Sequence, residues 1–334
     1  MKNYGKIALF CALIFIFAAS PAFSQLTLGD LQKQVGDFSS KIAQSMPFNS
    51  TMGLNWSDAY IGQLIDLPPH FGIGLSTGFT TLNIGSINGL MKMFGEELPV
   101  NLPAGFPLLG YTVEVRIGGF LLPFDIGAKF GYMDLSIRDL LGVDIKYMLF
   151  GGDVRYALIK GDALPLKLSI GVGFNHLSGG ISKTLPLGQS FNFNSGSTTY
   201  RLSMTDPDLG LKWETNCLEL KAHISFPLIV ITPYAGFGFS YSWSKAGYEV
   251  KSDISAWNNT TQVPLNNVKD AIKSFGIDNI NENGFGRMIE VEAFNIRAFG
   301  GFSINIAVFR LDLTGMYNFM DSSFGITTGL RFQF

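Results

Sequence analysis

The feature that most restricts the fold of this chain is the strict two-residue alternation of its last thirteen residues. Apolar side chains and one threonine occupy every second position from Phe324 to Phe334. Small or polar residues, including Arg331, occupy the positions between them. A two-residue period predicts a β-strand, because successive side chains of a strand point to opposite faces. One apolar and one polar face are typical of a strand in the wall of a transmembrane barrel.

Nine more segments alternate in the same way, beginning near His70, Tyr111, Phe124, Tyr147, Leu164, Leu209, Thr232, Met288 and Val308. No segment after residue 24 has the roughly eighteen consecutive apolar residues of a transmembrane helix. The sequence therefore predicts an all-β membrane protein, an antiparallel transmembrane β-barrel formed by residues 67–334. Weaker strand candidates at 55–67 and 190–204 leave the strand number open between ten and fourteen, and an even number is expected.

The first 24 residues have the pattern of a secretory signal peptide. Lys2 and Lys6 precede an apolar run of twelve residues from Ala8 to Ala19, and small residues follow up to Ser24. The run is shorter than the roughly twenty residues of a membrane-spanning helix. Cleavage would remove two lysines and no acid, changing the net charge from −2 to −4, which argues against nucleic acid as a partner. The expected location is the outer membrane of a diderm bacterium.

The connections between the expected strands differ in length. Those at 123–125, 160–165, 226–233 and 305–308 are short, whereas those at 84–110, 178–198 and 247–286 are long. Short periplasmic turns and long outer loops produce this asymmetry in outer-membrane barrels. It predicts that both ends of the mature chain lie in the periplasm.

Residues 25–66 carry a helical pattern, with apolar residues at Leu28, Leu31, Val35, Phe38, Ile42 and Met46, before Pro47 ends it. Such a helix must bury its apolar face in the barrel interior or on the membrane surface. We expect this segment to be a hatch or plug docked by Leu28, Leu31, Val35 and Phe38. The first long loop holds a second apolar group, the candidate ligand-binding residues Ile87, Leu90, Met91 and Phe94.

One expected strand changes phase along its length. Leu211 and Trp213 have odd numbers, whereas Leu218 and Leu220 have even numbers, so the apolar positions do not share one face. A β-bulge at 214–217 would restore a single apolar face. Cys217 would then be a small residue at that bulge.

The polar faces of the expected strands carry charges of both signs. The set expected to line the lumen is Glu114, Arg116, Asp153, Arg155, Glu219, Lys221, His223, Arg310, Asp312 and Arg331. Mixed signs favour internal ion pairs or a plugged pore over a strongly charge-selective channel. An acid–base role for His223 beside Glu219 and Lys221 is the alternative to plain lumen lining.

The sequence lacks the spacing patterns of catalytic and metal sites. His70, His176 and His223 are its only histidines, and no two of them lie close enough for a metal motif. Cys217 has no cysteine or histidine partner at motif spacing, and no nucleophile elbow occurs. We therefore expect a protein that is not an enzyme and that holds neither a metal nor a cofactor.

Three stretches resemble outer-membrane barrels of the FadL-like group, which transport long-chain fatty acids and other hydrophobic compounds: GLNWSDAYIGQL, FGGDVRYALIKGDALPLKLSIGVGFNHLSGGI and LKWETNCLELKAHISFPLIVITPYAGFGFSYSWSKAGY. In that group an N-terminal hatch fills a fourteen-stranded barrel. Hydrophobic ligands enter between outer loops and leave toward the periplasm or laterally through the wall. The resemblance implies that residues 25–66 are the hatch and that 84–110 form part of the entry site. The terminal Phe334 resembles the signal that such barrels present to their assembly machinery.

The leading hypothesis is an outer-membrane transporter for hydrophobic small molecules such as long-chain fatty acids. Its expected partners are membrane lipid, the hydrophobic ligand and the barrel assembly machinery. The alternatives are a structural or adhesive barrel that presents the 247–286 segment at the surface, a general diffusion porin, and a barrel-embedded hydrolase. Ligand binding, steady conductance and lipid turnover distinguish these possibilities.

Overall fold

The computed structural model describes residues 28–61, 70–82, 105–119, 123–137, 143–161, 165–184, 189–195, 197–274 and 280–334. The expected signal peptide and the candidate ligand-binding residues Ile87, Leu90, Met91 and Phe94 lie outside this part of the chain.

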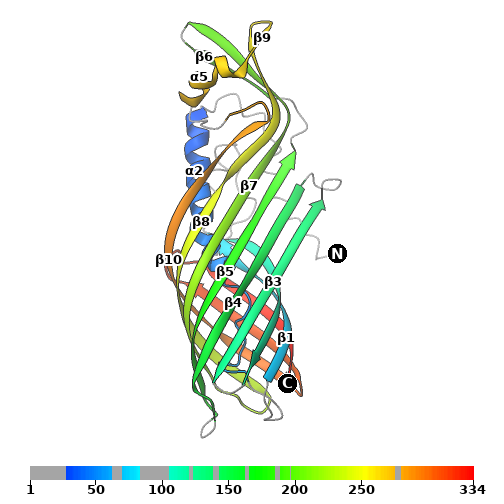
Figure 1. The fold of residues 1–334 in the computed structure, drawn as a ribbon, viewed down its shortest axis with the longest axis vertical. Helices are drawn as coiled ribbons and strands as arrows, with labels where there is room; N and C mark the ends of the chain where they lie inside the picture. The colour runs from blue at the N-terminus through cyan, green and yellow to red at the C-terminus, as the bar shows by residue number, and fades with distance from the viewer. Residues whose placement is uncertain are drawn as a thin grey trace.

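A closed antiparallel β-barrel of ten strands dominates the described residues (Figure 1). Its strands are β1 (His70–Leu82), β2 (Phe106–Gly118), β3 (Phe124–Ile137), β4 (Val143–Ile159), β5 (Lys167–Thr184), β7 (Thr198–Ser225), β8 (Ile231–Asn258), β10 (Gly284–Ile306), β11 (Phe309–Asn318) and β12 (Phe324–Gln333). They follow one another around the wall in chain order, and β1 pairs with β12 to close it. The predicted fold class is confirmed, and each alternating segment forms one strand.

The outer wall of the barrel is apolar, as the two-residue period requires. Ile126 and Leu220 are more than half exposed, whereas their chain neighbours Asp125 and Glu219 are buried. On the outer face of three adjacent strands, Leu218, Tyr241 and Phe294 stand in one row. In the second outward-facing row from there toward the tip, the same three strands carry Glu214, Lys245 and Glu290. An apolar band bounded by aromatic and then charged residues is what a barrel turns to hydrocarbon.

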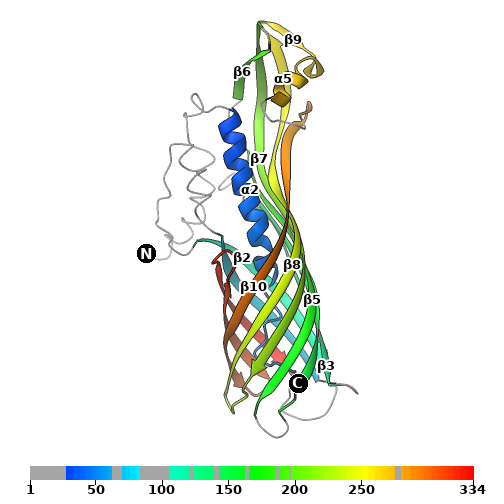
Figure 2. The same ribbon diagram turned by 90° about the vertical axis from the view of Figure 1, so that its left-hand side faces the viewer.

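One side of the molecule is much taller than the other. β7 and β8 have 28 residues each, whereas β11 and β12 have 10. The tall strands end in a tip built from β6 (Gln189–Ser195), β9 (Thr261–Val263), η2 (Leu265–Asn267) and α5 (Lys269–Ser274) (Figures 1 and 2). The tip has its own core, which includes Met204, Ile254 and Ile272. The expected loop 178–198 is therefore mostly strand, and the expected loop 247–286 begins and ends in strand. Residues 190–204 form a hairpin of the tip instead of extra barrel crossings.

The helix α2 (Leu28–Ser50) lies along the inner side of the tall wall, against β7, β8 and β10 (Figure 2). It runs past Pro47, so the expected end of the helix there is wrong. Proline removes one backbone donor, and the last turn is held by other groups: the Ser50 hydroxyl donates to Pro47 O and the Thr51 hydroxyl to Phe48 O. None of the described helices has the length and hydropathy that crossing a membrane requires.

The segment 51–61 continues from α2 down the inside of the barrel and is buried throughout. No strand forms over 55–61, because its polar groups bond to side chains of the wall and not to a neighbouring strand. α2 begins near the tip, whereas Phe334 pairs with Phe71 at the other end, where the short turns lie (Figure 1). The prediction that both chain ends share one end of the barrel is therefore wrong for the described residues.

The expected β-bulge at 214–217 is also wrong. Residues 209–225 of β7 pair with β5 and β8 in unbroken register, and the shift on the β8 side lies between Thr205 and Asp208. Leu211 and Trp213 face inward, like Cys217 and Glu219. The inner face becomes apolar there because it packs against α2.

The ladder between β2 and β3 is the shortest among the pairings of the ten barrel strands. It joins only Val113–Gly118 to Asp125–Phe130, although both strands continue toward the tip. Beyond Val113 the Tyr111 hydroxyl donates to Tyr132 O across this seam. The expected loop 84–110 also ends earlier than predicted, since residues 106–110 belong to β2 and pair with β1.

Candidate functional site

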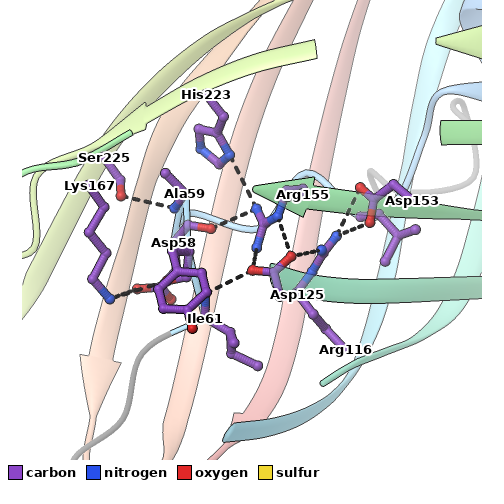
Figure 3. Close-up of polar contacts among 12 residues, drawn as sticks. Asp58, Ala59, Ile61, Arg116, Asp125, Asp153, Arg155, Lys167, His223 and Ser225 are labelled. Atoms are coloured by element: carbon purple, nitrogen blue, oxygen red, sulfur yellow. Dashed lines mark hydrogen bonds and ion pairs between the residues drawn. The ribbon is translucent and has the colours of Figure 1, made fainter. Parts of the chain in front are cut away.

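The lower lumen of the barrel is filled by the chain's own segment 51–61, which we call the plug. Ala59 N donates to Ser225 Oγ at 2.9 Å, and Ile61 N donates to Asp125 Oδ2 at 3.0 Å. Figure 3 shows these contacts beside the ion pairs of the wall. Buried backbone groups need such partners because water does not reach them. The plug is therefore held by hydrogen bonds all along its length.

Asp58 is the electrostatic centre of the plug. Its carboxylate lies 3.1 Å from Arg331 Nη1, 3.7 Å from Arg310 Nε and 3.9 Å from Lys167 Nζ, three cations from three different strands. Burial alone would disfavour the charged carboxylate, but three cations within 4 Å compensate for the lost hydration. Asp58 is therefore ionised, and it neutralises part of a strongly basic pocket.

Trp56 anchors the plug against the wall. Its indole Nε1 donates to Glu114 Oε2 at 2.5 Å, and the guanidinium of Arg331 lies 4.8 Å from the ring centroid. A cation over an indole face is attracted by the ring quadrupole. Gly72 in β1 leaves room for the ring, since a Cβ there would lie 2.7 Å from it.

Four cations of the wall donate hydrogen bonds to backbone carbonyls of the N-terminal segment, and one of them, Lys167, donates from Nζ to Tyr60 O at 3.2 Å. Lys129 Nζ donates to Ser50 O at 2.8 Å and to Met52 O at 2.5 Å. Arg155 Nη1 donates to Asp58 O at 2.8 Å (Figure 3). Lys221 Nζ donates to Leu54 O at 3.5 Å. These bonds do not depend on the side chains of the plug.

The wall also carries ion pairs of its own. Arg116 Nη1 lies 2.5 Å from Asp125, Arg155 Nη2 lies 2.7 Å from the same carboxylate, and Arg116 Nη2 lies 2.7 Å from Asp153 (Figure 3). Further pairs are Lys221–Asp153, Arg297–Glu219 and Arg331–Asp312. In a low-dielectric interior such pairs are costly unless their partners are in place. Paired charges of both signs therefore line the lower lumen around the plug.

The structure places the residues expected to line the lumen inside the barrel, where Glu114, Arg116, Asp153, Arg155, Glu219, Lys221, His223, Asp312 and Arg331 are buried and Arg310 is half-buried. His223 Nδ1 lies 3.4 Å from Arg155 Nη1, and its ring packs against Tyr234 and Phe299. His223 therefore lies between a wall cation and two aromatic rings.

Several members of the network were not expected from the sequence: Asn55, Trp56, Asp58, Asp125, Lys129 and Arg297. Asp125, Lys129 and Arg297 lie on the polar faces of β3 and β10, so the alternation contained the signal for them. Trp56 and Asp58 lie in a segment without a regular period, and nothing local indicates what they contact.

Above the plug, the inner face of the tall wall is apolar and is covered by α2. Phe38, Ile42 and Met46 of the helix share a core with Leu82, Tyr147, Leu149, Leu177 and Ala246. Leu108, Met133, Leu211, Trp213 and Val291 pack against it. Phe38, an expected docking residue, is buried in this core. Leu28, Leu31 and Val35 lie on α2, but their side chains are outside the described part of the structure.

A cavity of about 600 Å³ opens beside this apolar core. Its lining includes the apolar and aromatic side chains of Met133, Tyr147, Leu211 and Trp213, together with charged residues such as Lys146 and Glu249. Ligand sites for small molecules have volumes of roughly 300 to 1,000 Å³ and mostly apolar walls. The cavity is therefore large enough for a small hydrophobic molecule with a polar end.

Among the described residues, no group of three or more His, Cys, Asp or Glu side chains is arranged to hold a metal ion. Cys217 is buried in the wall of the barrel, away from any described bulge.

Comparison with protein families settles where the chain belongs. Residues 121–334 match the model of a family of unknown function, DUF6588. The chain is a member of this DUF6588 family. The matched range contains eight of the ten barrel strands, from β3 to β12, and leaves out β1, β2 and the plug. The match therefore rests on the barrel wall.

Comparison with solved structures finds other β-barrels at low similarity. A major outer membrane protein from Thermus thermophilus is 13% identical, with 80% of this chain and 100% of that chain covered and a TM-score of 0.31. The outer membrane protease OmpT from Escherichia coli is 11% identical, with 84% and 100% covered and a TM-score of 0.37. A Pseudomonas aeruginosa FadL homologue is 9% identical, with 80% and 89% covered and a TM-score of 0.23. Curated proteins give no match to this sequence.

Proposed function

We propose that this DUF6588 protein is an outer-membrane transporter for hydrophobic small molecules such as long-chain fatty acids. The apolar outer wall, bounded by an aromatic and then a charged row, supports a place in a membrane. The expected signal peptide and the terminal Phe334 support export and insertion by the barrel assembly machinery. The short-turn end then faces the periplasm, and the tip faces the cell exterior.

The observation that carries the transport function is the apolar inner wall above a closed lumen. A water-filled porin has a polar interior, but here the tall wall presents Leu211, Trp213 and Val291 inward. The 600 Å³ cavity lies beside these residues. We propose that a hydrophobic molecule binds there, and that Ile87, Leu90, Met91 and Phe94 help to capture it. α2 and the plug act as the hatch.

The β2–β3 seam is the proposed way out for the ligand. The lower lumen is occupied by buried ion pairs, which a hydrophobic molecule cannot replace without leaving charges unpaired. The seam carries no ladder beyond Val113 and Phe130, and the adjoining Tyr132 and Met133 line the cavity. A ligand that leaves there enters the bilayer without crossing the polar network.

Ligand binding tests the capture site. Trp213→Ala should weaken the binding of a fluorescent fatty acid by the purified protein about tenfold, which corresponds to about 1.4 kcal/mol. The indole supplies much of the apolar surface that the ligand would contact. Trp257→Ala, at a tryptophan of the tip that stacks on Arg201, is the matched control and should bind normally. Equal affinity of both variants would remove the cavity from the mechanism.

Cross-linking tests the exit. In the variant Tyr111→Cys with Tyr132→Cys, a short reducible cross-linker should block the uptake of a labelled fatty acid into cells that express the protein, and reduction should restore uptake. Because Tyr132 lines the cavity, fatty-acid binding by the purified double variant is measured before and after cross-linking, and the affinity should be the same in both states. Uptake that continues at the normal rate through the cross-linked seam would contradict the lateral route.

A structured surface barrel is the second candidate, and the tip favours it. The tip has its own apolar core with Met204, Ile254 and Ile272, so it would present a defined surface to the outside. Failure of the purified protein to bind any hydrophobic probe, together with normal uptake by cells that lack it, would favour this function over transport.

A further inference from the structure

The N-terminal segment runs through the barrel from the tip end to the short-turn end. Gly36 of α2 lies against the side chain of Ile289 on the tall wall, and Ser45 Oγ lies 3.2 Å from Asp321 Oδ2 near the top of the short wall. Ile61 N, sixteen residues later, bonds to Asp125 at the start of β3, at the short-turn end. The chain therefore enters from the tip end and descends through the lumen (Figures 1 and 2).

The level at which α2 begins follows from the register of the wall. Ile289 pairs with Ala246, which lies beyond the charged Lys245 and Glu290 row that bounds the apolar band. Gly36 contacts Ile289 and thus lies above that band. The helix extends eight residues further toward its first residue, Leu28, which at about 1.5 Å per residue adds roughly 12 Å.

We infer that the first turns of α2 are presented at the cell surface, with the segment threaded through its own barrel. The inference rests on the proposed outer-membrane location, with the short-turn end in the periplasm. Since Ile61 continues toward β1 at the short-turn end, the plug is joined to the wall at the periplasmic side, and α2 begins on the outer side. A reagent that does not cross the membrane can therefore reach α2 from outside the cell.

The different ways in which α2 and the plug are held determine which end of the segment opens first. The lower plug is held by Asp58 and by wall cations bonded to its carbonyls, whereas α2 is held chiefly by apolar packing with Phe38, Ile42 and Met46. A hydrophobic molecule arriving from outside competes for the same apolar wall that α2 covers. Opening then begins at the surface end of the segment, and the ion-paired lower plug stays in place.

Labelling of single cysteines on intact cells tests the inference. In a background with Cys11→Ala and Cys217→Ser, one cysteine is placed at Asp37 on α2, at Thr260 in the tip, or at Ile229 in the β7–β8 turn, all three exposed. A membrane-impermeant maleimide should label the Asp37→Cys and Thr260→Cys variants on intact cells. It should label Ile229→Cys only after the outer membrane is permeabilised. Heat-dependent migration on gels checks that each variant is folded.

The other outcomes separate the two proposals. Labelling of Thr260→Cys on intact cells, with Asp37→Cys labelled only after permeabilisation, would overturn surface presentation and leave the outer-membrane location intact. Labelling of Ile229→Cys but not Thr260→Cys on intact cells would reverse the orientation and overturn the inference. If all three variants react only after permeabilisation, the surface location itself fails.

Discussion

Deletion of residues 28–61 is expected to turn a barrel closed to ions into one that conducts continuously. In the intact protein these residues fill the lumen and bond to Arg331, Lys129 and Arg155 of the wall. Without them the inward charges of the wall would be hydrated, and a ten-stranded barrel with a polar lumen would hold water. In planar bilayers the mean conductance of the deletion variant should exceed that of the intact protein by about tenfold or more.

The control for this experiment keeps residues 28–61 and changes one wall residue that contacts them. Asp321→Ala removes the contact with Ser45 and the local hydrogen bonds from Ser323 at the top of the short wall, and it should leave the low conductance of the intact protein unchanged. A folded deletion variant that conducts no better than the intact protein would mean that residues 28–61 do not close the lumen.

Replacement of Asp58 by alanine is expected to be the most destabilising single change in the plug. It would leave Arg331, Arg310 and Lys167 without their shared anion inside the barrel. Removal of one partner from a buried ion pair costs about 3–5 kcal/mol, because the remaining charge stays desolvated. Urea unfolding in detergent, followed by the loss of barrel circular dichroism, measures the free energy of unfolding.

Asp134→Ala is the matched control for Asp58. Asp134 also pairs with a cation, at 3.7 Å from Lys146, but both side chains are exposed, and exposed pairs contribute little to stability. This variant should unfold like the intact protein. Equal stability of the Asp58→Ala variant and the control would show that the plug is not held by its carboxylate.

The barrel strands could be predicted from short stretches of sequence, because the alternation of apolar and polar residues involves only neighbouring positions. A strand between hydrocarbon and a polar lumen must alternate, so Phe324, Ile326 and Leu330 indicate their own environment. The same rule selected inward charges such as Arg116 and Asp153 without knowledge of their partners. All ten barrel strands were expected for this reason.

The wrong predictions, of a β-bulge and of a helix end at Pro47, concern the part of the interior where the wall is neither polar nor in contact with water. Leu211 and Trp213 break the polar inner face because α2 lies against them, and this break was mistaken for a bulge. The helix passes Pro47 because Ser50 and Thr51 stabilise its last turn. The packing of α2 against Leu211 and Trp213 joins distant parts of the chain, whereas the hydrogen bonds of Ser50 and Thr51 join residues three apart in the sequence.

By itself, the amino-acid sequence determined the class of the fold, the ten alternating segments that form the wall and the inward face of charges such as Arg116 and Asp153, since all three follow from the spacing of neighbouring residues. Only the tertiary structure decided that the segment 51–61 fills the lumen, that Asp58 meets Arg331 and Lys167, and that α2 enters from the tip. Those features depend on groups far apart in the chain, brought together by closure of the barrel, and no local period encodes them.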